Sequence, residues 1–364
     1  MIKEENAYGA VIVGSGANKQ FDCEALTARY VKENNLTRRD DDSDKTLRYD
    51  PDSGLHKPVL DYEIRNGIAD LARRLANEAD EPELAAKISP RLIYSLVTRV
   101  KDLALPALAP ERVGEDVIHV ANGMLVIGDD RREKLEAFSP DWGSRNRTEI
   151  AWNPEADCPR FKHELLGQAM SKDDARLVQK YFGQSLLGRN PSQTFMILQG
   201  TPGGGKSTLV NILETVIGRE NVMELRPGHL GGRFETQRFL GKTLLTGKDV
   251  GADFFESQAA GVLKAIVGGD TLYSESKHDN DSAAVAGDFN VAIATNTNLR
   301  ICLDGDGDAW RRRMLIVNYD RPKPVKPIPD FDQLLLREEG EGILRWLVEG
   351  AVALLVHCKL QSFG

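Results

Sequence analysis

The sequence predicts an α/β fold, and a short glycine-rich stretch with its two flanks is the main reason. Residues 198–208, LQGTPGGGKST, satisfy the pattern G-x-x-x-x-G-K-[ST] at every position. The apolar, β-prone run at 194–198 precedes this stretch, and residues 207–217 read as a helix after it. Strand-like and helix-like segments then alternate as far as Tyr319, which is typical of a sheet covered by helices.

The residue types in the glycine-rich stretch are those that bind the phosphates of a nucleotide. Glycines let successive backbone N–H groups turn inward around an anion, where a Cβ would obstruct them. Lys206 can reach the β- and γ-phosphate oxygens, and Ser207 can place its hydroxyl on Mg²⁺. The following helix would point its positive N-terminal end at the phosphates. We therefore expect ATP and Mg²⁺ to bind at Gly200, Thr201, Pro202, Gly203, Gly204, Gly205, Lys206, Ser207 and Thr208.

Composition and charge exclude several other classes of protein. Hydrophobic residues make up 41% of the chain and charged residues 28%, which is ordinary for a globular protein. The net charge of −8 leaves no global basic field, so any nucleic-acid contact must be local. The apolar run at 351–356 is too short to span a membrane, and the N-terminus lacks the pattern of a secretory signal. We expect a cytoplasmic protein without a membrane partner.

Two other binding signals are weak. Gly14-Ser-Gly16 follows an apolar run and superficially resembles a dinucleotide-binding turn, but the third glycine and an immediate helix are missing. The four cysteines are far apart and form no CxxC pair, and the six histidines are scattered. The sequence therefore predicts no zinc site.

Composition and apolar periodicity divide the chain into four parts. Helical spacing of apolar residues is clear from about 58 to 105 and again from about 160 to 187. Four prolines within 321–329 predict an extended connector before a last helix that begins at about Glu341. The predicted parts are an N-terminal arm or linker (1–55), a mainly helical domain with a hairpin near 118–127 (56–190), the P-loop core (191–320), and the connector with a short C-terminal helical segment (321–364).

Polar residues at the ends of later apolar runs supply the other groups that a nucleotide hydrolase needs. Asp249 ends one such run and can hold Mg²⁺ and polarise the attacking water. Lys248 occupies the adjacent position, where a second acid is usual, so Asp253 and Glu256 are the remaining candidates for that acid. Asn296 ends a later run and can hold the water or sense the γ-phosphate.

Three consecutive arginines at 311–313 stand just before another apolar strand. An arginine there can neutralise the charge of the transition state at a neighbouring subunit's site. Each of these signals also has a plain structural interpretation: Asp249 as a surface strand end, Asn296 as a turn residue, and the arginines as a solvated turn. Their order along the chain is therefore the stronger argument.

The order of the motifs from Lys206 to Arg311 resembles that in the superfamily 3 helicases. These helicases are AAA+-type hexameric motors of viruses, phages and plasmids. The likeness is greatest to the helicase half of phage/plasmid and poxvirus-type primase-helicases. Upstream, residues 122–127, 138–141 and 152–159 look like that family's pre-helicase segment, and residues 181–188 look like the helix that leads into its phosphate loop. The resemblance extends over residues 115–356 and implies an AAA+-like core behind an N-terminal helical collar.

The resemblance implies a role for each matching residue. Asp249 matches the family's Walker B acid, and Asn296 matches its sensor. Arg311 matches the arginine finger that acts in trans, with Arg312 as the close alternative because the register within the triplet is open. Lys277-His278 matches the tip of a hairpin that tracks DNA through the ring's pore, although the acidic flanks at 275, 279 and 281 would weaken phosphate attraction.

The function implied is that of an ATP-dependent DNA helicase or translocase of a phage, plasmid or mobile-element replication system. Its expected partners are single-stranded or forked DNA and further copies of the chain in a ring, as a hexamer. The chain ahead of residue 115 shows no primase carboxylate set, so a separate primase or initiator protein is also expected.

Two other functions fit parts of the pattern. A nucleotide-gated assembly or defence module would hydrolyse ATP without moving DNA, and the single Walker B acid favours it somewhat. A small-molecule P-loop kinase would be a monomer with Arg311 as a substrate clamp, which the order of Asn296 and the arginines argues against. Polarity of translocation, DNA or RNA preference and ring size are left open.

Overall fold

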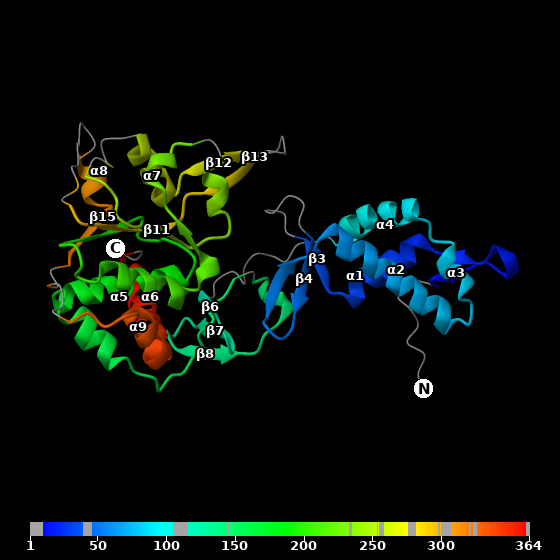
Figure 1. Cartoon of the computed structure of the whole chain (residues 1–364), viewed down its shortest axis with the longest axis horizontal. Coiled ribbons are helices and arrows are strands. Elements are labelled where there is room, and N and C mark those ends of the chain that lie inside the picture. Colours follow the sequence, from blue (N-terminus) through cyan, green and yellow to red (C-terminus); the bar gives the residue numbers. More distant parts are fainter. Residues whose placement is uncertain are drawn as a thin grey trace. The chain divides into compact units, whose positions relative to one another are not determined.

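The computed structural model describes residues 10–38, 46–104, 116–144, 146–232, 235–252, 254, 258–275, 282–297, 299, 307–319, 322 and 326–361. The chain forms two compact units (Figure 1). The first comprises residues 1–113 and 138–145, and the second comprises residues 114–137 and 146–364. These units divide the chain differently from the four parts expected from the sequence, whose boundaries stay predictions.

The first unit packs helices around an apolar core and carries short antiparallel strands. Within the stretch expected to be an arm or linker, the described residues already contain a helix and four strands. Leu26 and Tyr30 of the first helix are buried in the same core as the later helices. The elements are β1 (Ile12–Val13), β2 (Gln20–Phe21), α1 (Cys23–Glu33), β3 (Leu36–Arg38), β4 (Thr46–Asp50), β5 (Leu55–Pro58), α2 (Asp61–Glu78), α3 (Glu83–Ala86) and α4 (Pro90–Leu103).

The helical periodicity predicted between 58 and 105 is confirmed, and it belongs to three helices. Helix α2 starts where the Glu63 carboxylate accepts the backbone N–H of Leu60 at 2.8 Å. Helix α4 starts at Pro90, directly after Ser89, whose hydroxyl accepts the N–H of Leu92 at 3.2 Å. The four apolar residues that set the period in α2 are all buried: Ile64, Ile68, Leu71 and Leu75.

The second unit contains a five-stranded parallel sheet in the order β10-β11-β14-β9-β15. The expectation of an α/β fold is therefore confirmed at the level of a parallel sheet with helices. The strands are β9 (Phe195–Gln199), β10 (Val222–Glu224), β11 (Leu244–Gly247), β14 (Asn290–Thr295) and β15 (Met314–Asn318). The helices that accompany them are α5 (Lys172–Leu186), α6 (Lys206–Ile217), α7 (Gln258–Gly268), α8 (Gly307–Arg311) and α9 (Phe331–Gln361).

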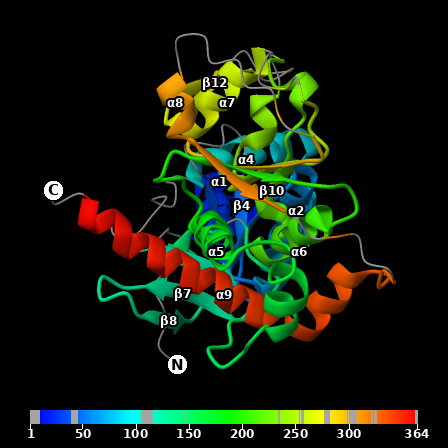
Figure 2. The same ribbon diagram turned by 90° about the vertical axis from the view of Figure 1, so that its left-hand side faces the viewer.

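Helices cover both faces of this sheet, and the interior strand β9 shows why. Met196 and Leu198 of β9 belong to the core that contains α5, α6 and α9, whereas Phe195 and Ile197 belong to the core that contains α7 and Trp310 of α8. Successive side chains of a strand point to opposite faces, so a strand with apolar residues throughout must be buried on both. Figures 1 and 2 show α5, α6 and α9 on one side of the strands and α7 and α8 on the other.

The hairpin predicted near 118–127 is confirmed, with a third strand beside it. β6 (Asp116–Val120), β7 (Gly123–Ile127) and β8 (Glu133–Glu136) form an antiparallel sheet. At the turn, the Asn122 side chain accepts the N–H of Trp152 at 2.8 Å and donates to the carbonyl of the same residue at 3.1 Å. The turn therefore anchors the start of the segment 152–159.

Helix α9 begins at Phe331, which corrects the expected start at about Glu341. The helix begins as soon as the proline-rich connector ends, and its first turns carry apolar residues of their own: Leu335 is fully buried in the core shared with α5 and α6. Its later apolar residues Ile343, Trp346 and Leu347 are also buried, and Val352 is partly buried. Among the described residues, no helix combines the length and apolar character needed to cross a membrane.

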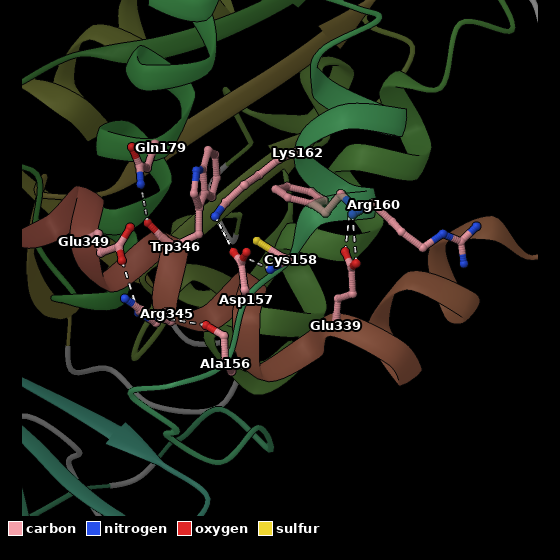
Figure 3. A network of polar contacts seen from close by, with 11 residues as sticks. Ala156, Asp157, Cys158, Arg160, Lys162, Gln179, Glu339, Arg345, Trp346 and Glu349 are labelled. Carbon is pink, nitrogen blue, oxygen red and sulfur yellow. Dashed lines mark hydrogen bonds and ion pairs between the residues drawn. The ribbon is translucent and has the colours of Figure 1, made fainter.

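The segment 153–162 lies along α9 and is held there by polar contacts (Figure 3). The buried carboxylate of Glu339 accepts the backbone N–H groups of Arg160 and Phe161, each at 2.8 Å. These N–H groups belong to the start of the π-helical turn Phe161–Leu166 and have no partner within it. Further along α9, the Arg345 guanidinium donates to the Ala156 carbonyl at 3.1 Å.

Glu339→Ala is expected to lower the free energy of unfolding by about 2–4 kcal/mol, because it leaves two N–H donors without their acceptor. Denaturant unfolding followed by circular dichroism measures this. The control is Glu349→Ala on the same helix, whose partly exposed pair with Arg345 at 3.2 Å is worth less than about 1 kcal/mol. Equal losses in the two variants would contradict the anchoring role of Glu339.

Candidate nucleotide-binding site

The glycine-rich loop connects the interior strand β9 to helix α6, as the sequence predicted. Gly203 and Gly205 have backbone φ angles of 79° and 99°, in the left-handed region that glycine adopts without strain. Gly200 is glycine for a different reason: a Cβ there would lie 2.0 Å from the backbone oxygen of Tyr319, just after β15. The loop therefore requires glycine both for its turns and for its close approach to the neighbouring strand.

Lys206 is the first residue of α6 and is buried, with 6% of its surface exposed. Its ammonium donates to the carbonyl oxygens of Gly200 and Thr201, both at 2.8 Å, so the side chain folds back over its own loop. Burial lowers the pKa of Lys206, and the negative charge of Asp249 opposes this change. The Asp249 carboxylate therefore interacts electrostatically with the Lys206 ammonium, although 43 positions separate the two residues in the sequence.

Asp249 and Asn296 lie together at the ends of neighbouring strands. Asp249 follows β11 and Asn296 follows β14, and these two strands pair in parallel. The Asn296 side-chain amide donates to Oδ1 of Asp249 at 3.0 Å, and both residues are exposed. Because β14 also pairs with β9, the P-loop, Asn296 and Asp249 follow one another along the same edge of the sheet.

The oxygen groups at this edge suit a magnesium ion that is held together with phosphates. Ser207 is exposed in the first turn of α6, and Asp249 supplies a carboxylate. Among the described residues, no group of three His, Cys, Asp or Glu side chains could hold a metal ion by itself. Mg²⁺ commonly binds through one or two carboxylates and the substrate's phosphates rather than through a complete protein cage. The residue types at 207 and 249 fit that mode.

The arginine triplet divides into two exposed residues and one buried residue. Arg311 is the last residue of α8 and Arg312 follows it; both are exposed, and Arg311 lies 3.8 Å from the exposed Asp308 carboxylate. Arg313 is 8% exposed and donates to the Ala309 carbonyl at 3.1 Å. Periodicity did not separate the three arginines; the fold leaves Arg311 and Arg312 able to reach another molecule.

Some of the predicted residues lie outside the described part of the chain. These are Lys277, His278, Asp253 and Glu256. The strands on either side of the first two form an antiparallel pair, β12 (Thr271–Glu275) with β13 (Ser282–Ala286), which precedes β14. A hairpin therefore stands where the sequence placed one.

Two residues at the site were not recognised as functional from the sequence. Lys248, noted only as the residue in place of a second acid, donates to the Glu214 carboxylate at 2.9 Å. Glu214 is a buried acid on α6. The available signal was a single charged residue within the mostly apolar stretch 209–217, where a charge needs a partner.

The segment that carries these residues matches a known family model. Residues 198–313 match a model described as a family of unknown function (DUF5906), and this segment runs from just before Gly200 to Arg313. No curated protein matches the chain. Similar solved structures include "The apo structure of NrS-1 C terminal region (305-718)", with a TM-score of 0.43, 15% identity, and coverage of 66% of this chain and 68% of that chain. Another is "The A form apo structure of NrS-1 C terminal region-CTR", with a TM-score of 0.44, 14% identity and the same coverage.

Arg313→Ala is expected to lower the free energy of unfolding by about 1–3 kcal/mol, because it removes a buried side chain and its hydrogen bond. Arg311→Ala and Arg312→Ala are matched controls and should change it by less than about 0.5 kcal/mol. Denaturant unfolding of the three variants measures the difference. A loss in Arg311→Ala as large as in Arg313→Ala would contradict the division of the triplet.

Proposed function

We propose that this protein is an ATP-dependent DNA helicase or translocase with an AAA+-type core. The observation that carries the proposal is the convergence of Lys206, Asp249 and Asn296 at the carboxyl ends of the parallel strands. They come from separate strand ends, and the sequence predicted each of them independently as part of a nucleotide site. A purely structural glycine turn would not require an acid and an amide on neighbouring strands.

The chemistry is ATP hydrolysis, with each group in a distinct role. The N–H groups of the loop and the start of α6 bind the phosphates, and Lys206 contacts the β- and γ-phosphate oxygens. Asp249 orients the attacking water, and Asn296 holds the Asp249 carboxylate and senses the γ-phosphate. Mg²⁺, held by Ser207 and Asp249, would neutralise charge on the phosphates.

Completion of the site by a second subunit is supported by the position of Arg311. Its side chain is 76% exposed at the end of α8, just before β15, which is an outermost strand of the sheet. An exposed arginine there is free to enter a neighbouring copy's nucleotide site, where it would stabilise the transition state. A site that is completed in trans requires at least a second subunit, and we propose a ring in the form of a hexamer.

The motor's contact with DNA is proposed for Lys277 and His278, between β12 and β13. The net charge of −8 favours such a local contact over a broad basic surface. Single-stranded or forked DNA is the proposed substrate, and a separate primase or initiator protein would load or prime it.

A nucleotide-gated assembly or defence module that does not unwind DNA is the second candidate. The observation that favours it is the single acid at the end of β11, because Lys248 stands in the adjacent position and points to Glu214. In that case hydrolysis would change the state of assembly without DNA. Dependence of hydrolysis on DNA separates the two candidates.

Lys206→Ala is expected to lower ATP hydrolysis by at least about 100-fold, because the phosphates lose their main cation. Single-stranded DNA should stimulate hydrolysis by the wild type, and Lys277→Ala should abolish only that stimulation. A coupled assay of phosphate release, with and without DNA, measures both effects. Hydrolysis that depends on Lys206 but is indifferent to DNA would overturn the helicase proposal in favour of the nucleotide-gated assembly.

Mixing Arg311→Ala with Lys206→Ala tests whether the site is completed in trans. Each variant alone should be inactive, but a mixed ring contains some interfaces with an intact Lys206 from one subunit and an intact Arg311 from the next. An equal mixture should recover roughly a quarter of wild-type hydrolysis if subunits assemble at random around a head-to-tail ring. The same mixture with Arg312→Ala in place of Arg311→Ala shows which arginine acts. No recovery in either mixture would contradict an arginine that acts in trans.

A further inference from the structure

An ion pair ties the strand end that carries Asp249 to the P-loop helix. The Lys248 ammonium donates to Oε2 of Glu214 at 2.9 Å and to Oδ1 of Asn211 at 2.8 Å, and both partners lie on α6. Thr246 donates its hydroxyl to the other oxygen of Glu214 at 2.6 Å. The Glu214 side chain is only 10% exposed, so the pair is shielded from solvent on the carboxylate side.

Asp249 has a backbone conformation that needs such support. Its φ angle is 56°, in the left-handed region that a residue with a Cβ rarely adopts. On its other side, the Val250 N–H donates to Ala294 at 3.3 Å, and the Val250 carbonyl accepts from the Thr295 hydroxyl at 2.9 Å. Asp249 is therefore a single strained residue between two anchors, one on α6 and one on β14.

The direction of the Lys248 side chain explains why a second acid is absent from this position. The side chain extends to a buried carboxylate on α6, so an acid at 248 would meet Glu214 with the same charge at close range. A lysine there neutralises Glu214 instead and joins the strand end to the helix that begins at Lys206. The two charged residues are thus complementary to each other rather than to a nucleotide.

We propose that Lys248, paired with Glu214, is a positioning residue that holds the Asp249 carboxylate beside Asn296 and the phosphate loop. This inference rests on the proposed function, because it concerns the acid of that same site. Without the pair, the strand end can relax from its left-handed conformation, and the Asp249 carboxylate then leaves its place at the sheet edge. Lys206 and the loop remain where they are, since neither contacts Lys248 in the described structure.

The test compares Lys248→Met, Lys248→Arg and Glu214→Gln in the full-length chain. Lys248→Met is expected to lower kcat by about 10- to 100-fold and to raise the half-saturating Mg²⁺ concentration, while the KM for ATP changes little. Lys248→Arg keeps the charge and the donors and should recover most of the activity. The matched control is Lys242→Met, because Lys242 lies just before the same strand and donates only to the Glu220 carbonyl, at 2.7 Å.

A double-mutant cycle and hydrogen exchange separate positioning from general destabilisation. If Lys248 acts through Glu214, the double variant Lys248→Met/Glu214→Gln should be no slower than Lys248→Met alone. Amide exchange of residues 248–252 should speed up in Lys248→Met and stay unchanged in Lys242→Met, whether or not a nucleotide is added.

The outcomes distinguish failure of this inference from failure of the proposed function. Wild-type hydrolysis that depends on Lys206, with an unchanged kcat and Mg²⁺ dependence in Lys248→Met, overturns the positioning role and leaves the ATPase intact. Absence of wild-type hydrolysis overturns the proposed function, and the exchange measurement still decides whether Lys248 holds the strand end. Unchanged exchange at 248–252 in Lys248→Met overturns the inference in either case.

Discussion

The pairing of β14 with both β9 and β11 is the constraint on which the rest of this site depends. In a parallel sheet all strands end at the same edge, so the residues that follow three adjacent strands must lie in one row. The pair Thr295 with Gln199 brings the ends of β14 and β9 level, and the pair Gly247 with Ile293 places the end of β11 close to them. The phosphate loop, Asn296 and Asp249 are consequently neighbours, although the chain visits other elements between them.

The sheet edge can hold these groups in place because the layer behind it is closely packed. A Cβ on Gly183 of α5 would lie 2.4 Å from the Leu347 carbonyl of α9, so the two helices cross with their backbones almost in contact. The same α9 carries Glu339, which holds the π-helical turn before α5. Helices α5, α6 and α9 share one apolar core with the sheet, and α6 bears Lys206 at its first position. The candidate site residues therefore stand on a closely packed layer of helices and strands.

Positively and negatively charged side chains alternate at the site, and their pairing bears on the proposed chemistry. Lys206 is partly desolvated and lies in the field of Asp249, while Lys248 neutralises the buried Glu214 one layer behind. Asp249 thus stands between two lysines, of which Lys206 folds over the glycine-rich loop and Lys248 joins the strand end to α6. Arg311 and Arg312 stay exposed at the opposite end of the sheet, beside the edge strand β15, where a second molecule can approach them.

The sequence by itself determined the features that depend on short-range physics. The glycine-rich loop between a strand and a helix, the period of α2 and the Asn-Gly hairpin were all predicted, because each depends on residues within a few positions of one another. The contact between Asn296 and Asp249, the burial of Arg313 beside two exposed arginines, and the pair of Glu214 with Lys248 were decided only by the tertiary structure. Each of these joins elements far apart in the chain, and a local pattern carries no information about which strands become neighbours or which side chains the core encloses.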